Sequence, residues 1–273
     1  MDHQSIVDYY TGEDEGARLP ASPHGRLELL RTQELLVRLL PPAPASVLDV
    51  GGATGVYAGW LAARGYTVHV VDLVPAHVAA AGALPGVTAA VADARALPAA
   101  DASVDAVLLL GPLYHLTERA DRLRALREAA RVARPGALIA GAVIGRHAGL
   151  LDLGRRGDLD DDMLALIMET VSNGRHDARI GFMATHFHTG PEAAAEFTDA
   201  GLPDPDVYGI EGPLWTAAAA AAGTGAHARD PDTRPADGFA ERVFDNALLA
   251  ARAVERDPLM HPYSAHLFLA ART

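Results

Sequence analysis

Five short apolar runs recur between residues 46 and 144, and stretches with helical spacing or glycine turns separate them. The runs read SVLDV, TVHVVD, VTAAVA, AVLLL and ALIAGAVI. They are apolar almost throughout, without the in–out alternation of a half-exposed strand. This pattern is typical of strands buried on both sides by helices, as in a parallel sheet. The sequence therefore predicts an α/β fold with a doubly wound, Rossmann-like sheet.

The rest of the chain is organised around these runs, and we expect residues 1–273 to form a single domain. Ser22 and Pro23 are typical of a helix N-cap followed by proline, so a helix is predicted within residues 1–45, the N-terminal helical segment called the cap below. Residues 145–190 lose the strand–helix rhythm and are predicted to be a lid or insertion with one helix near 163–171. Residues 191–273 should complete the sheet. The expected elements there are helices over 191–200, after 216 and over 239–254, a polar loop HARDPDTRPADG, and strands in VYGIEG and SAHLFLA.

Composition excludes several classes of protein. The chain has 35 acidic and 23 basic side chains, and its net charge of −12 disfavours nucleic acid as a partner. It has no cysteine, no basic secretory leader and no apolar stretch near the roughly 18 residues that span a bilayer. We therefore expect a cytoplasmic protein without a membrane segment, either a monomer or a homodimer. The acidic run DLDDD at 158–162 is typical of a solvated helix start, and no metal site is predicted.

The first run leads into a glycine-rich turn, DVGGATG, at residues 49–55. Ligands of parallel sheets bind beyond the carboxyl ends of the strands, and glycine lets the chain approach them closely. The glycine spacing of a dinucleotide site is not met, because Gly51, Ala53 and Val56 occupy that register. The carboxyl group of Asp49 would attract an ammonium group and repel a pyrophosphate. The turn therefore favours a ligand that carries a positive charge.

Residues 49–55 resemble motif I of the class I S-adenosylmethionine-dependent methyltransferases, in which an acid precedes glycines at every second position. Ala53 takes the place of the middle glycine. Three further segments match the family in order: VHVVD ending at Asp72, ADARALPAADASVDAVLLL starting at Ala92, and RVARPGALI before the fifth run. The resemblance implies that residues 46–144 bind S-adenosylmethionine and release S-adenosylhomocysteine. It also implies a seven-stranded sheet in which SAHLFLA inserts antiparallel.

The resemblance also implies roles for individual residues. Asp72 would accept hydrogen bonds from the ribose hydroxyls, and Asp93 would receive the adenine amino group. Arg31 in the cap could pair with the methionyl carboxylate or be an ordinary arginine on an amphipathic helix. The complete cofactor set predicted in this way is Asp49, Gly51, Gly52, Ala53, Gly55, Asp72, Leu73, Asp93, Ala94, Arg95, Leu110, Gly111, Tyr10 and Arg31.

The segment GPLYHL, residues 111–116, resembles small-molecule methyltransferases, including ubiquinone and menaquinone methylases. Tyr114 and His115 would then lie beside the transferred methyl group, although such residues are also common in packing. His186 and His188 are further candidates for a general base, because imidazole titrates near neutral pH. The predicted partner is a small-molecule acceptor, methylated on oxygen, nitrogen or carbon. Two alternatives stay open: a non-catalytic cofactor-binding module and a nicotinamide-dependent oxidoreductase.

Overall fold

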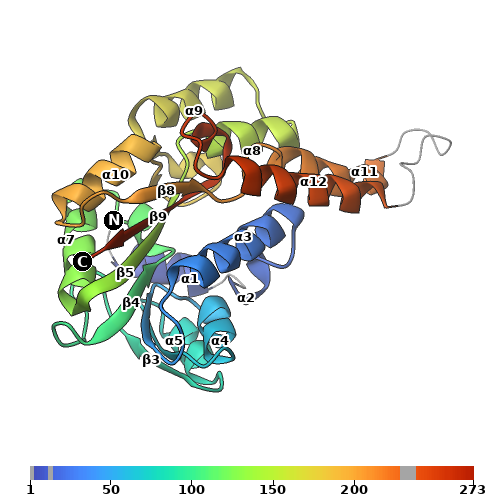
Figure 1. The fold of residues 1–273 in the computed structure, drawn as a ribbon. Coiled ribbons are helices and arrows are strands. Elements are labelled where there is room, and N and C mark those ends of the chain that lie inside the picture. The colour runs from blue at the N-terminus through green and yellow to red at the C-terminus, as the bar shows by residue number, and fades with distance from the viewer. Residues whose placement is uncertain (1–2, 12–14, 228–237) are drawn as a thin grey trace.

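A computed structural model describes residues 3–11, 15–227 and 238–273, and its centre is a seven-stranded sheet (Figure 1). The strand order is β3-β2-β1-β4-β5-β9-β8, with neighbours parallel except for β9, which runs antiparallel to both β5 and β8. The strands are β1 Ser46–Val50, β2 Thr67–Asp72, β3 Val87–Val91, β4 Val104–Leu109, β5 Ala133–Ile144, β8 Asp206–Gly209 and β9 His266–Arg272. All five apolar runs are strands, and the antiparallel insertion of SAHLFLA is confirmed.

Helices cover both faces of the sheet, as the apolar runs predict. Ala106 and Leu108 of β4 pack on one face with α3 (Pro23–Leu39), α4 (Val56–Ala62) and α5 (Pro75–Gly82). Val107 and Leu109 pack on the other face with α7 (Arg119–Val132) and α10 (Gly190–Asp199). Successive strand residues point to opposite faces, so a strand with helices on both sides must be apolar at nearly every position.

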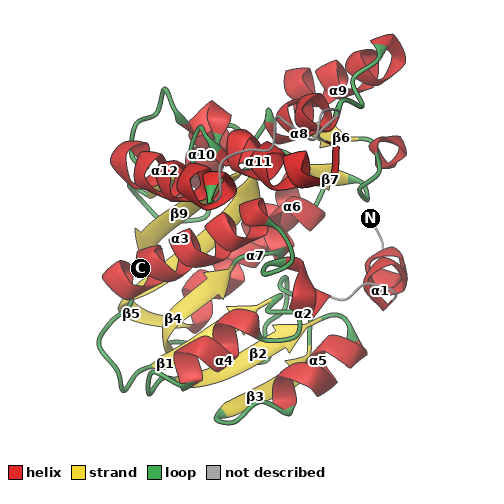
Figure 2. Ribbon diagram, turned by 90° about the vertical axis from the view of Figure 1, so that its right-hand side faces the viewer, coloured by secondary structure: helices red, strands yellow, loops and turns green. Residues whose placement is uncertain are grey.

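The cap contains α1 (His3–Thr11), α2 (Glu15–Arg18) and α3. Ser22 caps α3 as predicted, since its side chain accepts a hydrogen bond from the backbone N–H of Gly25 and Pro23 begins the helix. Figure 2 shows α1 beyond the carboxyl ends of β1 and β2, outside the body of the sheet. A short helix, α6 (Pro112–His115), follows β4 at the same edge. The cap is therefore placed to cover whatever binds at these strand ends.

The segment from 145 to 190, called the insertion below, has more structure than the sequence predicts. It contains the expected helix as α9 (Asp161–Asn173) and a further helix, α8 (Ala148–Arg156). Strands β6 (Arg175–His176) and β7 (Thr185–His186) pair antiparallel beside a 3₁₀ turn, η1 (Ala178–Ile180). Asp160 accepts a hydrogen bond from the N–H of Met163, so the acidic run DLDDD does start a helix. Helix α8 and strands β6 and β7 were not predicted, because these short elements are stabilised by tertiary contacts and have no clear local pattern.

The C-terminal part follows the expected order. It contains α11 (Trp215–His227), α12 (Phe239–Val254) and a 3₁₀ turn, η3 (His261–Tyr263), before β9. The polar loop HARDPDTRPADG lies largely at 228–237, outside the described residues. Among the helices that are described, none is long and apolar enough to cross a membrane.

Candidate functional site

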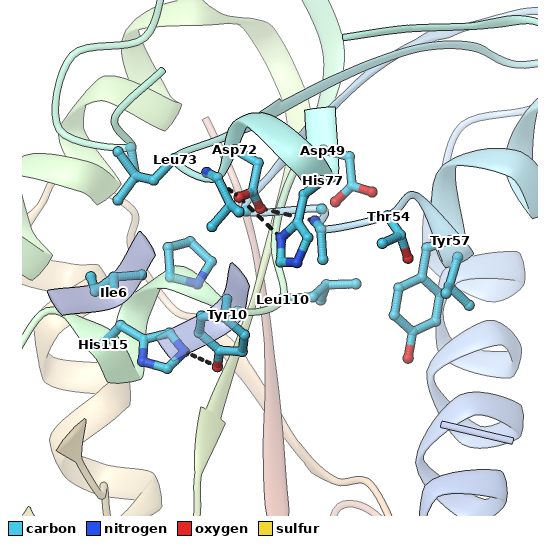
Figure 3. A pocket seen from close by; sticks show the side chains of 18 of the residues that line it. Ile6, Tyr10, Asp49, Thr54, Tyr57, Asp72, Leu73, His77, Leu110 and His115 are labelled. Carbon is cyan, nitrogen blue, oxygen red and sulfur yellow. Dashed lines mark hydrogen bonds and ion pairs between the residues drawn. The ribbon is translucent and has the colours of Figure 1, made fainter. Parts of the chain in front are cut away.

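A pocket that is partly open to solvent, called the cavity below, lies at the carboxyl ends of β1, β2 and β4. Residues of the cap, of the glycine turn and of α5 and α6 line it, and Figure 3 shows their side chains converging on one space. Of the predicted residues, those that line the cavity are Tyr10, Asp49, Gly51, Gly52, Ala53, Asp72, Leu73, Asp93, Ala94, Leu110, Gly111, Tyr114 and His115. The topology of a parallel sheet accounts for this convergence, because loops after its strands meet at one edge.

The glycines of the turn are required by close approach and by backbone conformation. A Cβ atom on Gly52 would lie 2.6 Å from Oδ2 of Asp49, and one on Gly51 would lie 2.9 Å from Cδ of Pro112. Gly55 has a φ of +85° and begins α4 without lining the cavity. Ala53 has a φ of +48°, in the left-handed region that glycine adopts most easily. The family's middle glycine is thus replaced at a position where the backbone favours glycine.

Asp49 is the most unusual ionisable group of the cavity. Its side chain is 1% exposed, and its Oδ2 has no hydrogen-bond partner. Burial, together with the neighbouring charge of Asp72, raises the pKa of Asp49 to about 7. A buried carboxyl group without a partner is costly to ionise, and a cation beside it would relieve that cost. The donor set therefore fits a ligand with an ammonium group, as the sequence predicts.

Asp72, at the end of β2, is held by the surrounding backbone. Its Oδ1 accepts a hydrogen bond of 2.9 Å from the N–H of Val74, and its Oδ2 accepts one of 3.0 Å from the N–H of Ala53. Each carboxylate oxygen has two lone pairs, so both keep capacity for a ligand hydroxyl. The carboxylate of Asp72 is therefore fixed in place and able to accept more hydrogen bonds.

The third acid, Asp93, is bonded to Arg95. The guanidinium of Arg95 contacts both oxygens of Asp93 and also donates a hydrogen bond of 2.7 Å to Asp121. Arg95 does not line the cavity, whereas Asp93 and Ala94 do. The structure thus turns the Arg95 side chain toward α7 and gives it an orienting contact with Asp93.

His115 of α6 faces the cavity and meets the cap. Its Nε2 lies 2.8 Å from the hydroxyl of Tyr10, and its Nδ1 is buried without a hydrogen-bond partner. Burial lowers the pKa of His115 to about 4, against a smaller opposing effect of Asp72. The ring of Tyr114 lies 4.5 Å from that of His115, measured between centroids. His115 is therefore a neutral imidazole near pH 7, and one of its nitrogens is free to pair with a ligand.

Besides Gly55 and Arg95, three predicted residues, Arg31, His186 and His188, are not brought to the cavity. Arg31 is 1% exposed and pairs with Glu34 and Glu255, beside a separate groove between α3 and α12. His186 and His188 lie side by side, with ring centroids 4.5 Å apart, but neither lines the cavity.

The acids of α10 explain where the two histidines point. Nε2 of His186 lies 2.8 Å from Glu192, and Nε2 of His188 lies 3.4 Å from Glu196. Glu196 is itself buried in an ion pair with Arg122, whose guanidinium lies 2.7 Å away. The imidazoles therefore face α10, and the expectation that they serve as bases at the site is corrected.

Several residues that line the cavity were missed as site residues, among them Ile6, Glu28, Tyr57 and His77. Glu28 accepts two hydrogen bonds of 3.1 Å from the guanidinium of Arg18. His77 could have been noticed, because it lies five residues after Asp72 in the first turn of the helix that Pro75 begins. Glu28 had no local signal, since it lies within an ordinary helical stripe.

A buried charged cluster connects the cap to β9. Ligand atoms of Glu28, Glu211 and His266 lie within 4.8 Å of one another. His266 Nδ1 is 2.6 Å from Glu211, and Arg18 neutralises Glu28. Burial alone would lower the pKa of His266, but Glu28 and Glu211 outweigh it and raise the pKa to about 9. With His266 protonated the four charges balance, so the cluster is an ion-pair network that fixes the cap.

Known proteins resemble this chain in sequence over part of its length. Residues 48–141 match the family model described as a methyltransferase domain. The methyltransferase GfsG of Streptomyces halstedii is 34% identical over 144 residues, which are 50% of this chain and 48% of GfsG. The ubiquinone/menaquinone biosynthesis C-methyltransferase UbiE of Acidiphilium cryptum is 37% identical over 109 residues, 37% of this chain and 43% of UbiE. The chain thus matches less than half the length of each of these relatives.

Solved structures share the fold over most of the chain. An S-adenosylmethionine-dependent methyltransferase of Thermotoga maritima has a TM-score of 0.60 at 17% identity and covers 98% of both chains. A phosphoethanolamine N-methyltransferase of Haemonchus contortus, solved with S-adenosylhomocysteine, has a TM-score of 0.57 at 18% identity, over 100% of this chain and 60% of its own. The [4+2]-cyclase SpnF has a TM-score of 0.54 at 17% identity, over 90% of this chain and 80% of its own. At these identities the likeness establishes the fold, and the SpnF match means that the fold by itself does not fix the reaction.

Proposed function

We propose that this chain, whose residues 48–141 match a methyltransferase domain, is a class I S-adenosylmethionine-dependent methyltransferase that transfers a methyl group to a small-molecule acceptor. The observation that carries the proposal is Asp49, a buried carboxyl group with an unpartnered oxygen beside a turn in which Gly51 and Gly52 leave no room for a Cβ atom. Asp49 would hold the ammonium group of S-adenosylmethionine, and Asp72 would hold its ribose. Leu73 and Ala94 border the space for the adenine, with Asp93 at its edge.

When bound, S-adenosylmethionine supplies a methyl group already activated on a sulfonium. The protein then has to align the acceptor, exclude water and remove a proton where the acceptor is a hydroxyl group. Alignment contributes up to about 7–11 kcal/mol to such a displacement, whereas a general base contributes roughly 10²- to 10⁴-fold in rate. The aromatic and apolar side chains of Tyr10, Tyr114 and Leu116 enclose the acceptor end of the cavity. Positioning is therefore the main task of this site.

His115 is the residue of the cavity best suited to orient an acceptor hydroxyl or take its proton. It is neutral above its lowered pKa of about 4, and its Nδ1 has no other partner. The bond between Tyr10 and Nε2 fixes the ring, and this places the free nitrogen. We infer that Nε2 of His115 donates its hydrogen to the hydroxyl of Tyr10, which leaves Nδ1 as the acceptor nitrogen. Oxygen acceptors suit this arrangement, because Nδ1 can then accept the hydrogen bond of a hydroxyl group.

Calorimetry and a transfer assay test the proposal together. We expect S-adenosylmethionine and S-adenosylhomocysteine to bind, and labelled methyl to appear on members of a panel of phenols and alcohols. His115→Gln should lower the transfer rate about 10²-fold or more while leaving the affinity for S-adenosylhomocysteine within about twofold. No binding of either cofactor form at millimolar concentration would refute the proposal.

One observation favours a second candidate, a cofactor-binding module without methyl transfer. Tyr10 already bonds to His115, so a side chain of the protein occupies one nitrogen of the presumed acceptor site. Such a module would bind S-adenosylhomocysteine normally and release no labelled methyl to any acceptor. Tyr10→Phe distinguishes the methyltransferase from the binding module. Removing the hydroxyl should change the transfer rate of an enzyme, whereas a module shows no transfer with or without it.

A further inference from the structure

His77 lies in the first turn of α5, and the structure leaves its imidazole without a hydrogen bond. The residue is 5% exposed, it lines the cavity, and neither Nδ1 nor Nε2 has a hydrogen-bond partner. Its Nδ1 lies 3.4 Å from Oδ1 of Asp72. Figure 3 shows the ring between the carboxyl group of Asp72 and the ring of Tyr10, whose centroid is 5.9 Å away. His77 therefore points into the space that a ligand would fill.

A buried polar group without a partner costs about 1–3 kcal/mol, and most buried polar side chains in proteins are paired. Leucine or methionine would pack at this position without that cost. The imidazole of His77 thus carries an unmet hydrogen-bonding capacity directed at the cavity. A ligand group beside Asp72 would meet it.

The neighbouring acid indicates which ligand group this is. Backbone N–H groups of Val74 and Ala53 fix the two oxygens of Asp72, which retain lone pairs for hydroxyl donors. A hydroxyl that donates to Asp72 keeps its own lone pairs, and these require a nearby donor. His77 lines the cavity beside the same carboxyl group, with its Nδ1 3.4 Å from Oδ1 of Asp72, and every imidazole carries at least one N–H donor.

We propose that His77 donates a hydrogen bond to a ribose hydroxyl whose proton is accepted by Asp72, so that the two residues together select a ribonucleoside. The inference rests on the proposed function, because it places the ribose of S-adenosylmethionine at Asp72. The pair makes His77 a specificity-determining residue for the sugar. A site built to pair with a hydroxyl discriminates strongly against an analogue that lacks it.

The test is calorimetry of S-adenosylhomocysteine and of its 2′-deoxy and 3′-deoxy analogues, with wild type, His77→Leu and His77→Gln. His77→Leu should weaken S-adenosylhomocysteine binding by about 5- to 30-fold, and His77→Gln should recover part of that loss because its amide still donates. Wild type and His77→Leu should bind one of the two deoxy analogues with equal affinity, because that analogue lacks the hydroxyl group to which His77 donates.

His176→Leu is the matched control. His176 is 6% exposed and neither of its ring nitrogens has a hydrogen-bond partner, but it lies in the insertion and does not line the cavity. Its replacement should leave the affinity unchanged.

Three outcomes overturn the inference. If wild type binds S-adenosylhomocysteine and folded His77→Leu binds it equally well, His77 has no role in the sugar site. An equal loss for all three ligands would mean that His77 only shapes the cavity. Failure of wild type to bind S-adenosylhomocysteine at all would remove the proposed function, and the inference with it.

Discussion

Binding of S-adenosylhomocysteine should release a proton from Asp49, and this reaction reports directly on the buried carboxyl group. Because the pKa of Asp49 is raised from 3.8 to about 7, the free protein holds about 0.9 proton on this residue at pH 6 and about 0.1 at pH 8. The ammonium group of the ligand favours the ionised carboxylate and lowers its pKa. We therefore expect close to one proton released per site at pH 6 and little release from Asp49 at pH 8.

The same pKa has a consequence for stability. The folded state binds the additional proton, so the free energy of unfolding falls as pH rises from 3.8 to about 7 and then levels off. At about 1.36 kcal/mol for each pH unit between those values, the ionised form costs up to about 4 kcal/mol. Asp49→Asn removes this cost, so the free protein should become more stable at pH 8 by up to that amount while its affinity for S-adenosylhomocysteine falls.

The assay is calorimetry at pH 6 in two buffers of different ionisation enthalpy, which gives the number of protons exchanged. Urea unfolding of the free protein between pH 4 and 8 measures the change in stability. Asp49→Asn serves as the control for other groups, and adenosine serves as a ligand without an ammonium group. Proton release that persists in Asp49→Asn, or that is as large with adenosine, would refute the assignment of the ammonium group to Asp49.

Three further predictions concern stability and need only urea unfolding. Ala53→Gly and Ala102→Gly should each stabilise the protein by about 0.5–1 kcal/mol, because both alanines have a left-handed φ (48° and 49°) that glycine adopts more easily. A loss of stability in both variants would contradict this backbone conformation. The stability that His266 contributes should be complete below pH 6.5 and be lost as pH rises through about 9, up to about 3 kcal/mol, and His266→Gln should remove this dependence. Arg122→Ala should lower the free energy of unfolding by about 3–5 kcal/mol, because it leaves Glu196 buried and unpaired. The double variant Arg122→Ala with Glu196→Gln should recover much of this loss. Equal stability of wild type and both variants would show that the pair is unimportant.

The N-terminal half of the sheet could be predicted from the sequence because its signals are local. A strand covered on both faces is apolar at consecutive positions, and parallel strands end at one edge. Asp49, Asp72 and Asp93 lie near the ends of three runs, so they could be predicted to lie near one another. The glycine turn could also be predicted from the sequence, because its constraints are local. Gly52 is required by the carboxyl group only three residues before it, and this contact lies within the motif.

The histidines and the cap could not be assigned in this way. Among twelve histidines, the GPLYHL segment pointed to His115, which lines the cavity, but no local pattern showed that the acids of α10 hold His186 and His188 away from it. The hydroxyl of Tyr10 bonds to His115, which lies 105 residues later in the sequence. Arg31 likewise pairs with Glu255, which lies 224 residues later.

The sequence by itself thus determined the fold class and the edge of the sheet at which the cavity lies, since periodicity encodes these, and the resemblance to methyltransferase motifs pointed to the acids that line the cavity. Tertiary structure decided which side chains face the cavity and which are desolvated there. Burial gives Asp49 and His115 their shifted pKa values and leaves His77 without a partner. Burial is a property of packed surfaces that meet only after folding, so no local pattern in the chain records it.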